Sequence, residues 1–182
     1  MRGDVVAERV ARLRRTDPAP PQRLGRYVLG ERIGVGGMGA VYAAVHEATG
    51  APAAVKVAPS TAPEASRLIH EARALGDVDH PSVVKVYDCG EEGGFAWTAV
   101  QKIVGRTLQQ EIAERWAGSD GVFRLDGDAA AAPEPTPPSN AEVRVYVGWW
   151  RDLSRAFAAM HRAGVVHRDV KPANLMIDAR GA

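Results

Sequence analysis

The spacing of apolar residues divides the chain into an early part with strand patterns and a later part with helix patterns. Apolar runs at residues 27–34, 40–47 and 53–58 are short, and glycine-rich or proline-containing segments separate them. Such runs favour β-strands, and the turn at residues 50–52 suits an antiparallel meander. The alanine-rich run 40–47 also suits a helix by propensity alone, so the strand prediction there depends on the motifs described below.

Two later segments have the spacing of amphipathic helices. Residues 61–64 form a capping-box pattern with a proline in the first turn, which predicts a helix start at Thr61. The apolar stripe of this helix consists of Ala65, Leu68, Ile69, Ala72 and Leu75. A longer helix is predicted over residues 141–164, with Asn140 as N-cap and Gly164 at its end. Its stripe, predicted to be core, consists of Tyr146, Trp150, Leu153, Phe157 and Met160.

Between these helices the pattern predicts a hairpin and a short helix. Residues 83–90 and 95–101 flank a turn that contains Gly93 and Gly94, which is typical of two antiparallel strands. Thr107 is predicted to cap a helix that continues to about Trp116.

Two segments have the composition of linkers. Residues 3–15 could form a short helix, and the prolines of residues 16–24 predict a stiff linker, so the domain is predicted to occupy residues 26–182 after an extension of residues 1–25. Residues 117–140 are low in complexity and rich in proline, and they predict a disordered surface insertion.

Composition excludes several classes of function. The net charge of +1 gives no reason to expect nucleic acid or an anionic membrane as the main partner. No apolar run is long enough to cross a bilayer, and the N-terminus lacks the apolar region of a signal peptide. The single cysteine, Cys89, excludes an internal disulfide and fits a reducing compartment, so we expect the chain to be cytoplasmic.

The stretch of residues 165–178, VVHRDVKPANLMID, has the most distinctive chemistry in the chain. The apolar residues at its two ends predict two buried strands, and Pro172 keeps the loop between them from being a helix interior. In that loop Asp169 could accept the proton of a hydroxyl, Lys171 could hold phosphoryl charge, and the oxygen of Asn174 could bind Mg²⁺. The trio therefore indicates phosphoryl transfer, and the simpler alternative is a solvated loop between strands.

Two features of the early strands also suit phosphate binding. The glycines between the first two runs are spaced G-x-G-x-x-G-x-V, ending at Val41, and glycine lets the backbone approach phosphates closely. Dinucleotide-binding units share this spacing, but they have an acidic residue about 20 residues after the first glycine. This chain has Ala54 at that position after Gly34. Lys56 lies inside an apolar run, where a buried ammonium needs a partner; a lysine on a solvent-exposed edge strand is the alternative.

The polar loop resembles the catalytic loop of eukaryotic-like protein kinases, because His167, Arg168, Asp169, Lys171 and Asn174 all fall at that family's spacing. The glycine cluster and Lys56 resemble two further motifs of the family. The bacterial serine/threonine kinases are the most similar group. The resemblance extends from Tyr27 to Ala182 and implies an α+β fold, in which an antiparallel-sheet lobe with one helix precedes the start of a helical lobe.

The resemblance also implies roles for individual residues. Asp169 would deprotonate a protein Ser or Thr hydroxyl, Lys171 would steady the charge of the transition state, and Asn174 would bind Mg²⁺. Lys56 would hold the phosphates of ATP and pair with Glu71, for which an ordinary surface role is the alternative. The positions implied to bind ATP are Ile33, Gly34, Val35, Gly36, Gly37, Met38, Gly39, Ala40, Val41, Lys56, Gln101 and Ile103.

The sequence departs from the family pattern in two places. A glutamate is usual where Gln101 stands, and no Asp-Phe-Gly triplet follows Asp178. We therefore expect either the front portion of a longer kinase or a truncated product, with the stripe of the long helix exposed or covered by a dimer or another partner. A catalytically inactive, nucleotide-binding or regulatory module is the alternative to an active kinase.

Overall fold

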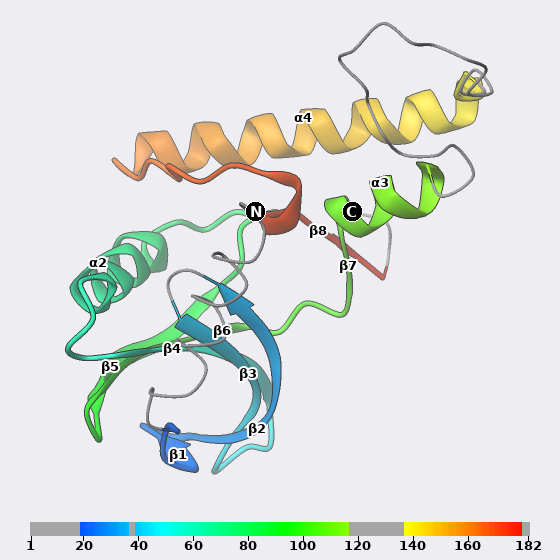
Figure 1. Cartoon of the computed structure of the whole chain (residues 1–182). Helices are drawn as coiled ribbons and strands as arrows, with labels where there is room; N and C mark the ends of the chain where they lie inside the picture. Colours follow the sequence, from blue (N-terminus) through cyan, green and yellow to red (C-terminus); the bar gives the residue numbers. More distant parts are fainter. Residues whose placement is uncertain (1–18, 37–38, 117–136, 180–182) are drawn as a thin grey trace, which may run out of the picture. The chain divides into compact units, whose positions relative to one another are not determined.

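A computed structural model describes residues 19–36, 39–116 and 137–179, which fall into two compact units. Unit 1 comprises the chain up to Asp77 together with Val84–Lys102, and unit 2 comprises Val78–Val83 and the chain from Ile103 onward. Together they contain an antiparallel sheet with one helix and a shorter, mainly helical part, so the predicted α+β class is confirmed (Figure 1).

Unit 1 is built on a six-stranded antiparallel sheet with the strand order β1-β2-β3-β4-β6-β5. The strands are β1 (Arg23–Leu24), β2 (Tyr27–Gly36), β3 (Gly39–His46), β4 (Pro52–Pro59), β5 (Val86–Glu92) and β6 (Phe95–Gln101). The predicted meander is therefore confirmed, and the alanine-rich run is a strand because it pairs on both sides, with β2 and with β4. β1 extends the sheet ahead of Arg26, where we expected the domain to start.

The two faces of the sheet are covered differently. On one face Val55 and Val57 of β4 belong to a core cluster with Tyr27 and Trp97. On the other face Ala58 packs with the apolar stripe of α2 (Glu64–Gly76). Because side chains alternate along a strand, Lys56 lies on the same face as Ala58, the face that α2 covers (Figure 1).

The helix α2 begins later than the capping pattern predicts. Its N-cap is Pro63, which makes no side-chain capping bond, so the predicted start at Thr61 is wrong. The buried residues of α2 are nevertheless four of the predicted five, namely Ala65, Leu68, Ile69 and Ala72. The helix begins close to Ala65, the first residue of the stripe that packs on the sheet, because packing of an apolar face contributes more to the stability of a helix than its cap does.

The β5–β6 hairpin turns where the sequence predicts. Gly93 and Gly94 both have positive φ angles, 59° and 82°, as a two-residue hairpin turn requires. Cys89 of β5 is half-buried against the α2 cluster and forms no disulfide, in agreement with a structural role.

Thr98 of β6 is 4% exposed, and its hydroxyl finds no hydrogen-bond partner in the described part of the chain. A buried polar group without a partner costs free energy, whereas an apolar group of the same shape does not. We therefore expect Thr98→Val to raise the free energy of unfolding by about 1 kcal/mol in chemical denaturation. Thr49→Val is the control, since the Thr49 hydroxyl accepts a bond from the Ala51 amide and its loss should not stabilise the chain. A destabilised Thr98→Val chain would contradict the prediction.

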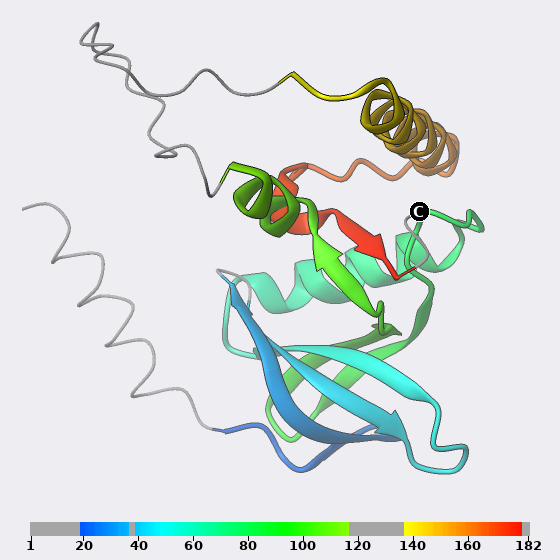
Figure 2. The ribbon, with the colours of Figure 1, turned by 90° about the vertical axis from the view of Figure 1, so that its right-hand side faces the viewer.

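Within its described residues, unit 2 has a small two-stranded sheet, two α-helices and one 3-10 helix, which can be followed in Figure 2. The elements are β7 (Gly105–Thr107), α3 (Leu108–Trp116), α4 (Asn140–Arg162), the 3-10 helix η1 (Pro172–Asn174) and β8 (Met176–Asp178). The prediction of a Thr107 cap is confirmed: its hydroxyl accepts a bond from the Gln110 amide, and the Gln110 side chain accepts one from the Thr107 amide. Of the two predicted buried strands around the polar loop, only β8 forms, and it is not buried. Val165 and Val166 form no strand, because the Val165 amide donates to the Met160 carbonyl in the turn that ends α4.

The long helix α4 is capped one residue earlier than predicted. Ser139, not Asn140, is the N-cap, and its hydroxyl and the Glu142 carboxylate form a reciprocal capping box. Met160 of the predicted stripe is buried, but Trp150 is 65% exposed within the described structure, so its prediction as core is wrong for this chain. Tyr146, Leu153 and Phe157 of the same stripe are half-buried. A dimer or another partner that covers Trp150 stays a prediction.

Several predictions concern residues outside the described part of the chain. These are the short N-terminal helix, the first three residues of the proline linker (16–18), and most of the insertion after Trp116. The end of the predicted linker is not a linker, because Arg23–Leu24 form β1 and pair with β2. Among the described helices, none combines the length and the apolar character needed to cross a membrane.

Candidate active site

The polar loop of unit 2 is anchored at both ends. Before it, Met160 at the end of α4 and Val165 are both buried. The ring of Phe157 packs against the rings of His161 and His167, at centroid distances of 6.5 and 6.3 Å. After the loop, β8 pairs with β7, and the Leu108 amide donates to the Leu175 carbonyl. The loop is therefore held between a helix end and a strand.

The backbone makes a tight turn just before Asp169. The Asp169 amide donates to the His167 carbonyl at 2.8 Å, and Arg168 between them has a φ of 59°. Arg168 is the only residue other than glycine with a positive φ in the described structure. Such a conformation costs free energy and is concentrated at functional sites, where it aims a particular side chain. Here the turn directs Asp169 toward the residues that follow.

Asp169, Lys171 and Asn174 form one hydrogen-bonded cluster, as the sequence predicted. The Lys171 ammonium lies 2.8 Å from Asp169 Oδ2, and Asn174 Nδ2 donates to the same oxygen at 2.9 Å and to the Asp169 backbone carbonyl at 2.8 Å. Pro172 starts η1, and this short turn brings Asn174 back to Asp169. Both side-chain bonds fall on Oδ2, so Oδ1 takes no bond from Lys171 or Asn174. The Asp169 side chain is 43% exposed and therefore open to solvent.

The cluster keeps Asp169 ionised. The hydrogen bond from Lys171, and then the one from Asn174, lower the pKa of the Asp169 carboxyl below its ordinary value. Because the folded-state pKa is lowered, the stabilisation is present above the unfolded pKa and is lost as pH falls through the folded pKa. At neutral pH Asp169 is therefore a charged hydrogen-bond acceptor.

We expect Lys171→Met to raise the pKa of Asp169 toward its ordinary value, because the first and largest cause of the lowering is removed. The measurement is a carboxyl ¹³C NMR titration. Lys85→Met, which removes an exposed lysine of unit 1, is the control and should leave the Asp169 titration unchanged. An unshifted pKa in Lys171→Met would show that the contact does not persist in solution.

In unit 1 the predicted phosphate loop is the β2–β3 hairpin, in which Gly34 pairs with Val41 and Gly36 pairs with Gly39. A Cβ atom on Gly34 would make only ordinary contacts, the shortest of 3.7 Å to Val41, and one on Gly36 would meet no described atom within 4 Å. The packing of the hairpin therefore does not require glycine at either position, and the space beside both residues is open to a ligand. Gly39 differs, because a Cβ there would overlap the Val57 carbonyl oxygen.

The remaining members of the predicted ATP set lie around this hairpin. Ile33 and Val35 of β2 are apolar side chains, 47% and 59% exposed, and Ile33 lies where the register of β2 with β3 is irregular. Ala40 and Val41 are half-buried on β3. The predicted contacts Gly37 and Met38 lie outside the described residues.

Lys56 and Glu71 lie on neighbouring elements of unit 1. Lys56 is half-buried on the face of β4 that α2 covers, between Val41 of β3 and Thr98 of β6 in the sheet register. Glu71 is half-buried at the margin of the α2 stripe, next to the buried Ala72. The elements are thus placed as the resemblance implies, while an ion pair between the two side chains stays a prediction.

The predicted ATP contacts Gln101 and Ile103 lie at the end of β6 and two residues after it. The Gln101 amide donates to the Lys85 carbonyl at 2.8 Å, and its side chain accepts a bond from the Lys85 amide. These two hydrogen bonds connect the end of β6 to the residue before β5. The neutral side chain of Gln101 makes one of them, so the negative charge of a glutamate is not required for it. Ile103 is half-buried and belongs to unit 2.

The donor set for a metal is limited in the described part of the chain. No group of three or more His, Cys, Asp or Glu side chains gathers there. Asn174 uses its amide nitrogen on Asp169, so its amide oxygen remains for a cation. Mg²⁺ is usually bound through one or two carboxylates together with phosphate oxygens and water, so the Asn174 oxygen could supply one of its ligands and the metal site stays a prediction.

Sequence reasoning missed the strand that supports the loop. β7 has three residues, too few for an alternating pattern, and its partner β8 lies some seventy residues later. The only sequence signal was Gly105, where a Cβ would overlap the Ile177 carbonyl oxygen. A glycine before an amphipathic helix has many explanations, so the pairing could not be predicted.

Comparisons with known proteins agree with this geometry. The model of the protein kinase domain matches residues 27–182. The serine/threonine-protein kinase pkn2 of Myxococcus xanthus is 32% identical over 163 residues, which are 86% of this chain and 17% of that protein. PknB of Mycobacterium leprae is 33% identical over 171 residues, 90% of this chain and 24% of that protein. This chain therefore spans less than a quarter of either relative.

Solved structures show the same fold. The kinase domain of PknI from Mycobacterium tuberculosis matches with a TM-score of 0.64 and 25% identity, over 91% of this chain and 60% of that one. The family model covers the segment that contains the glycine hairpin and the Asp169 cluster. The chain belongs to the protein kinase family.

Proposed function

We propose that this chain is the ATP-binding and catalytic-loop portion of a serine/threonine protein kinase, which transfers the γ-phosphoryl group of ATP to a Ser or Thr hydroxyl of a protein. The observation that supports it most directly is the cluster of Asp169, Lys171 and Asn174, held by three hydrogen bonds on an otherwise strained turn. The kinase names of the relatives support the same substrate class. The free Cys89 fits a reducing cytoplasm.

Each residue has a defined task in the proposed reaction. Asp169 Oδ1 accepts a hydrogen bond from the substrate hydroxyl and takes its proton as the hydroxyl oxygen bonds to the γ-phosphorus, while the bond from that phosphorus to the β,γ-bridging oxygen breaks and ADP leaves. Because its pKa is lowered, Asp169 is ionised before the hydroxyl arrives, so it orients the nucleophile in the ground state. Lys171 Nζ, one hydrogen bond away, balances the negative charge of the phosphoryl group in transit.

The nucleotide is assigned to unit 1. Backbone amides of the glycine hairpin face the phosphate oxygens, Lys56 neutralises them, and the exposed Ile33 and Val35 cover the apolar base. Glu71 holds Lys56 in place once the nucleotide is bound. Mg²⁺ would bind at the Asn174 amide oxygen and supply neutralisation of the phosphate charge.

The alternative, a regulatory module that binds nucleotide without turnover, has the same glycine hairpin but needs no Asp169 cluster. The test is to measure both activities on the chain, with labelled ATP, Mg²⁺ and a generic Ser/Thr-containing protein. Transfer to serine or threonine that depends on Asp169 supports the kinase. Nucleotide binding that is stoichiometric, without any transfer, would overturn it in favour of the regulatory module.

A further inference from the structure

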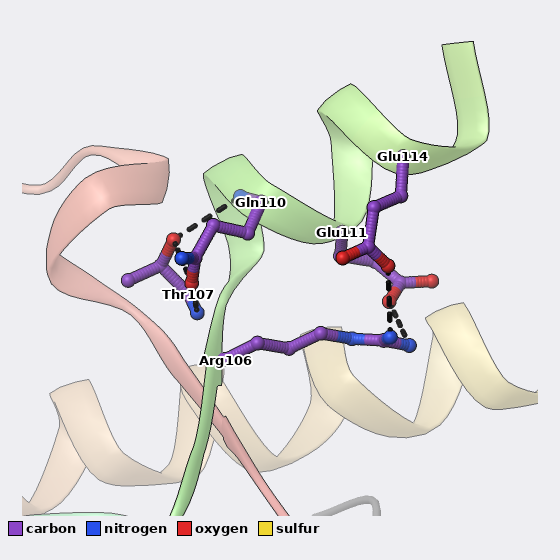
Figure 3. A network of polar contacts seen from close by, with 5 residues as sticks. All are labelled: Arg106, Thr107, Gln110, Glu111 and Glu114. Carbon is purple, nitrogen blue, oxygen red and sulfur yellow. Dashed lines mark hydrogen bonds and ion pairs between the residues drawn. The ribbon is translucent and has the colours of Figure 1, made fainter. Parts of the chain in front are cut away.

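Thr98 of β6 has a buried hydroxyl group that forms no hydrogen bond within the described part of the chain. The residue is 4% exposed, and among the residues that the structure describes it is the only polar one buried to this degree. Two other threonines show the usual arrangement. The Thr49 hydroxyl accepts a hydrogen bond from the Ala51 amide. The Thr107 hydroxyl bonds with both the amide and the side chain of Gln110 (Figure 3). The Thr98 hydroxyl therefore has a bonding capacity that the packing of the sheet does not use.

Thr98 lies directly beside Lys56, the lysine that we assign to the phosphates of ATP. The two residues are paired in the register of β4 with β6, so their side chains leave the sheet on the same face. Their Cβ atoms are then about 4.5–5.5 Å apart, a separation that the flexible four-carbon stem of a lysine can span. α2 covers this face, because Ala58, two residues after Lys56, packs with the buried stripe of α2. The Thr98 hydroxyl and the Lys56 stem therefore share the space between the sheet and α2.

The other neighbours of Thr98 on this face are poor hydrogen-bond partners. Across the sheet from Lys56, Thr98 is also paired with Cys89 of β5, and a thiol forms only weak hydrogen bonds. Ala96 and Val100, two residues away along β6, are apolar. The Lys56 ammonium is therefore the strongest donor among the side chains next to Thr98 in the register.

The hydroxyl of Thr98 is unfavourable for the stability of the sheet. A buried polar group without a partner costs free energy, which is why we expect Thr98→Val to be more stable than the parent chain. A group retained at such a cost is explained if its hydrogen bond forms when a ligand is bound nearby. Next to Lys56, that ligand is the nucleotide.

We propose that Thr98 is a positioning residue of the nucleotide site. Its hydroxyl accepts a hydrogen bond from the Lys56 ammonium when ATP binds, and this bond directs the ammonium toward the phosphate oxygens. The other N–H donors of the ammonium are then left for a phosphate oxygen and for the Glu71 carboxylate. This role rests on the proposed function and deepens it, because Thr98 acts on the nucleotide through Lys56.

The test measures the binding of a fluorescent ATP analogue with Mg²⁺ to the full chain by anisotropy. Thr98→Val should raise the Kd about tenfold, because a hydrogen bond to a charged group is lost. Thr98→Ser keeps the hydroxyl and should bind the analogue as the parent chain does, although loss of the methyl group lowers the stability of the fold. The more stable variant then binds more weakly than the less stable one, which a purely structural role of Thr98 cannot produce. Thr49→Val is the matched control, and its affinity should equal that of the parent chain.

A double-mutant cycle with Lys56→Met shows whether the hydroxyl acts through the ammonium. Lys56→Met alone should weaken binding, because the phosphates lose a positively charged partner. Adding Thr98→Val should then change the affinity little, since the hydroxyl has no ammonium to position. A further loss of about tenfold in the double variant, or weak binding by Thr98→Ser, would overturn the positioning role. Unchanged binding in Lys56→Met would overturn this role together with the assignment of Lys56 to the phosphates.

Transfer, assayed in the same chains with labelled ATP and a Ser/Thr-containing protein, separates the role of Thr98 from the kinase activity. If both hold, Thr98→Val should raise the KM for ATP more than it lowers kcat. A binding defect in Thr98→Val that Thr98→Ser does not share, without transfer by any chain, would sustain the role of Thr98 and overturn the activity. Transfer with the same KM for ATP in the parent chain and in Thr98→Val would sustain the activity and overturn the role.

Discussion

Asp169→Asn is expected to lower the rate of phosphoryl transfer by about 10²–10⁴-fold, the range that a positioned general base typically contributes. The amide oxygen of asparagine can still accept bonds from Lys171 and Asn174, so the loop should keep its conformation. What is lost is the carboxylate charge that attracts the hydroxyl proton. Because the nucleotide is assigned to unit 1, the KM for ATP should change little.

The measurement is the initial rate at saturating ATP and Mg²⁺, with a peptide as the acceptor. Asp79→Asn is the matched control, since Asp79 is an exposed residue of unit 2 outside the catalytic loop, and its rate should equal that of the parent chain. A loss of less than about tenfold in Asp169→Asn would mean that Asp169 is not the base. An equal loss in both variants would point to a general effect of charge.

The fold could be predicted largely because its strongest signals are local. Apolar spacing marks the stripe of α2, and the run through Val55 and Val57 marks a central strand. The Asp169 cluster could also be predicted, since a turn of six residues brings its members together without help from distant segments. Patterns of this kind require no knowledge of what packs against them.

The sequence predictions are wrong where the local structure depends on contacts with distant residues or on backbone dihedral angles. Val165 and Val166 have the composition of a strand, but the Val165 amide donates to the Met160 carbonyl and so belongs to the turn that ends α4. The caps were misplaced by one or two residues at Thr61 and Asn140, because capping depends on φ and ψ angles that neighbouring polar residues can each adopt. Trp150 fits the stripe of α4 by spacing, yet spacing does not say whether a second surface covers it.

The three glycines of the G-x-G-x-x-G motif have different structural roles in the β2–β3 hairpin. Gly34 and Gly36 have space for a side chain, so their small size is available to a ligand. Gly39 has no such space: its φ is 121°, and a Cβ would lie 3.0 Å from the Val57 carbonyl carbon and overlap its oxygen. The third glycine is therefore required by the approach of β3 to β4, next to Lys56.

Gly39→Ala is accordingly expected to destabilise unit 1 by about 2–6 kcal/mol, from an unfavourable backbone conformation and from overpacking against β4. That is a large fraction of the stability of an ordinary domain, about 5–15 kcal/mol. The loss of protection against hydrogen exchange should be largest for the β3 and β4 amides near Val57. Hydrogen exchange of these amides is therefore the measurement. Loss of nucleotide binding should follow, because Lys56 is displaced with its strand.

Gly36→Ala separates folding from binding within the same hairpin. Gly36 has no positive φ and an open environment, so the added methyl should leave the free energy of unfolding within about 1 kcal/mol of the parent chain. It should nevertheless weaken ATP binding, since the backbone can no longer approach the phosphates closely. If Gly39→Ala proved as stable as Gly36→Ala, the close contact with Val57 would not exist in solution. If Gly36→Ala bound ATP normally, the phosphates would lie elsewhere.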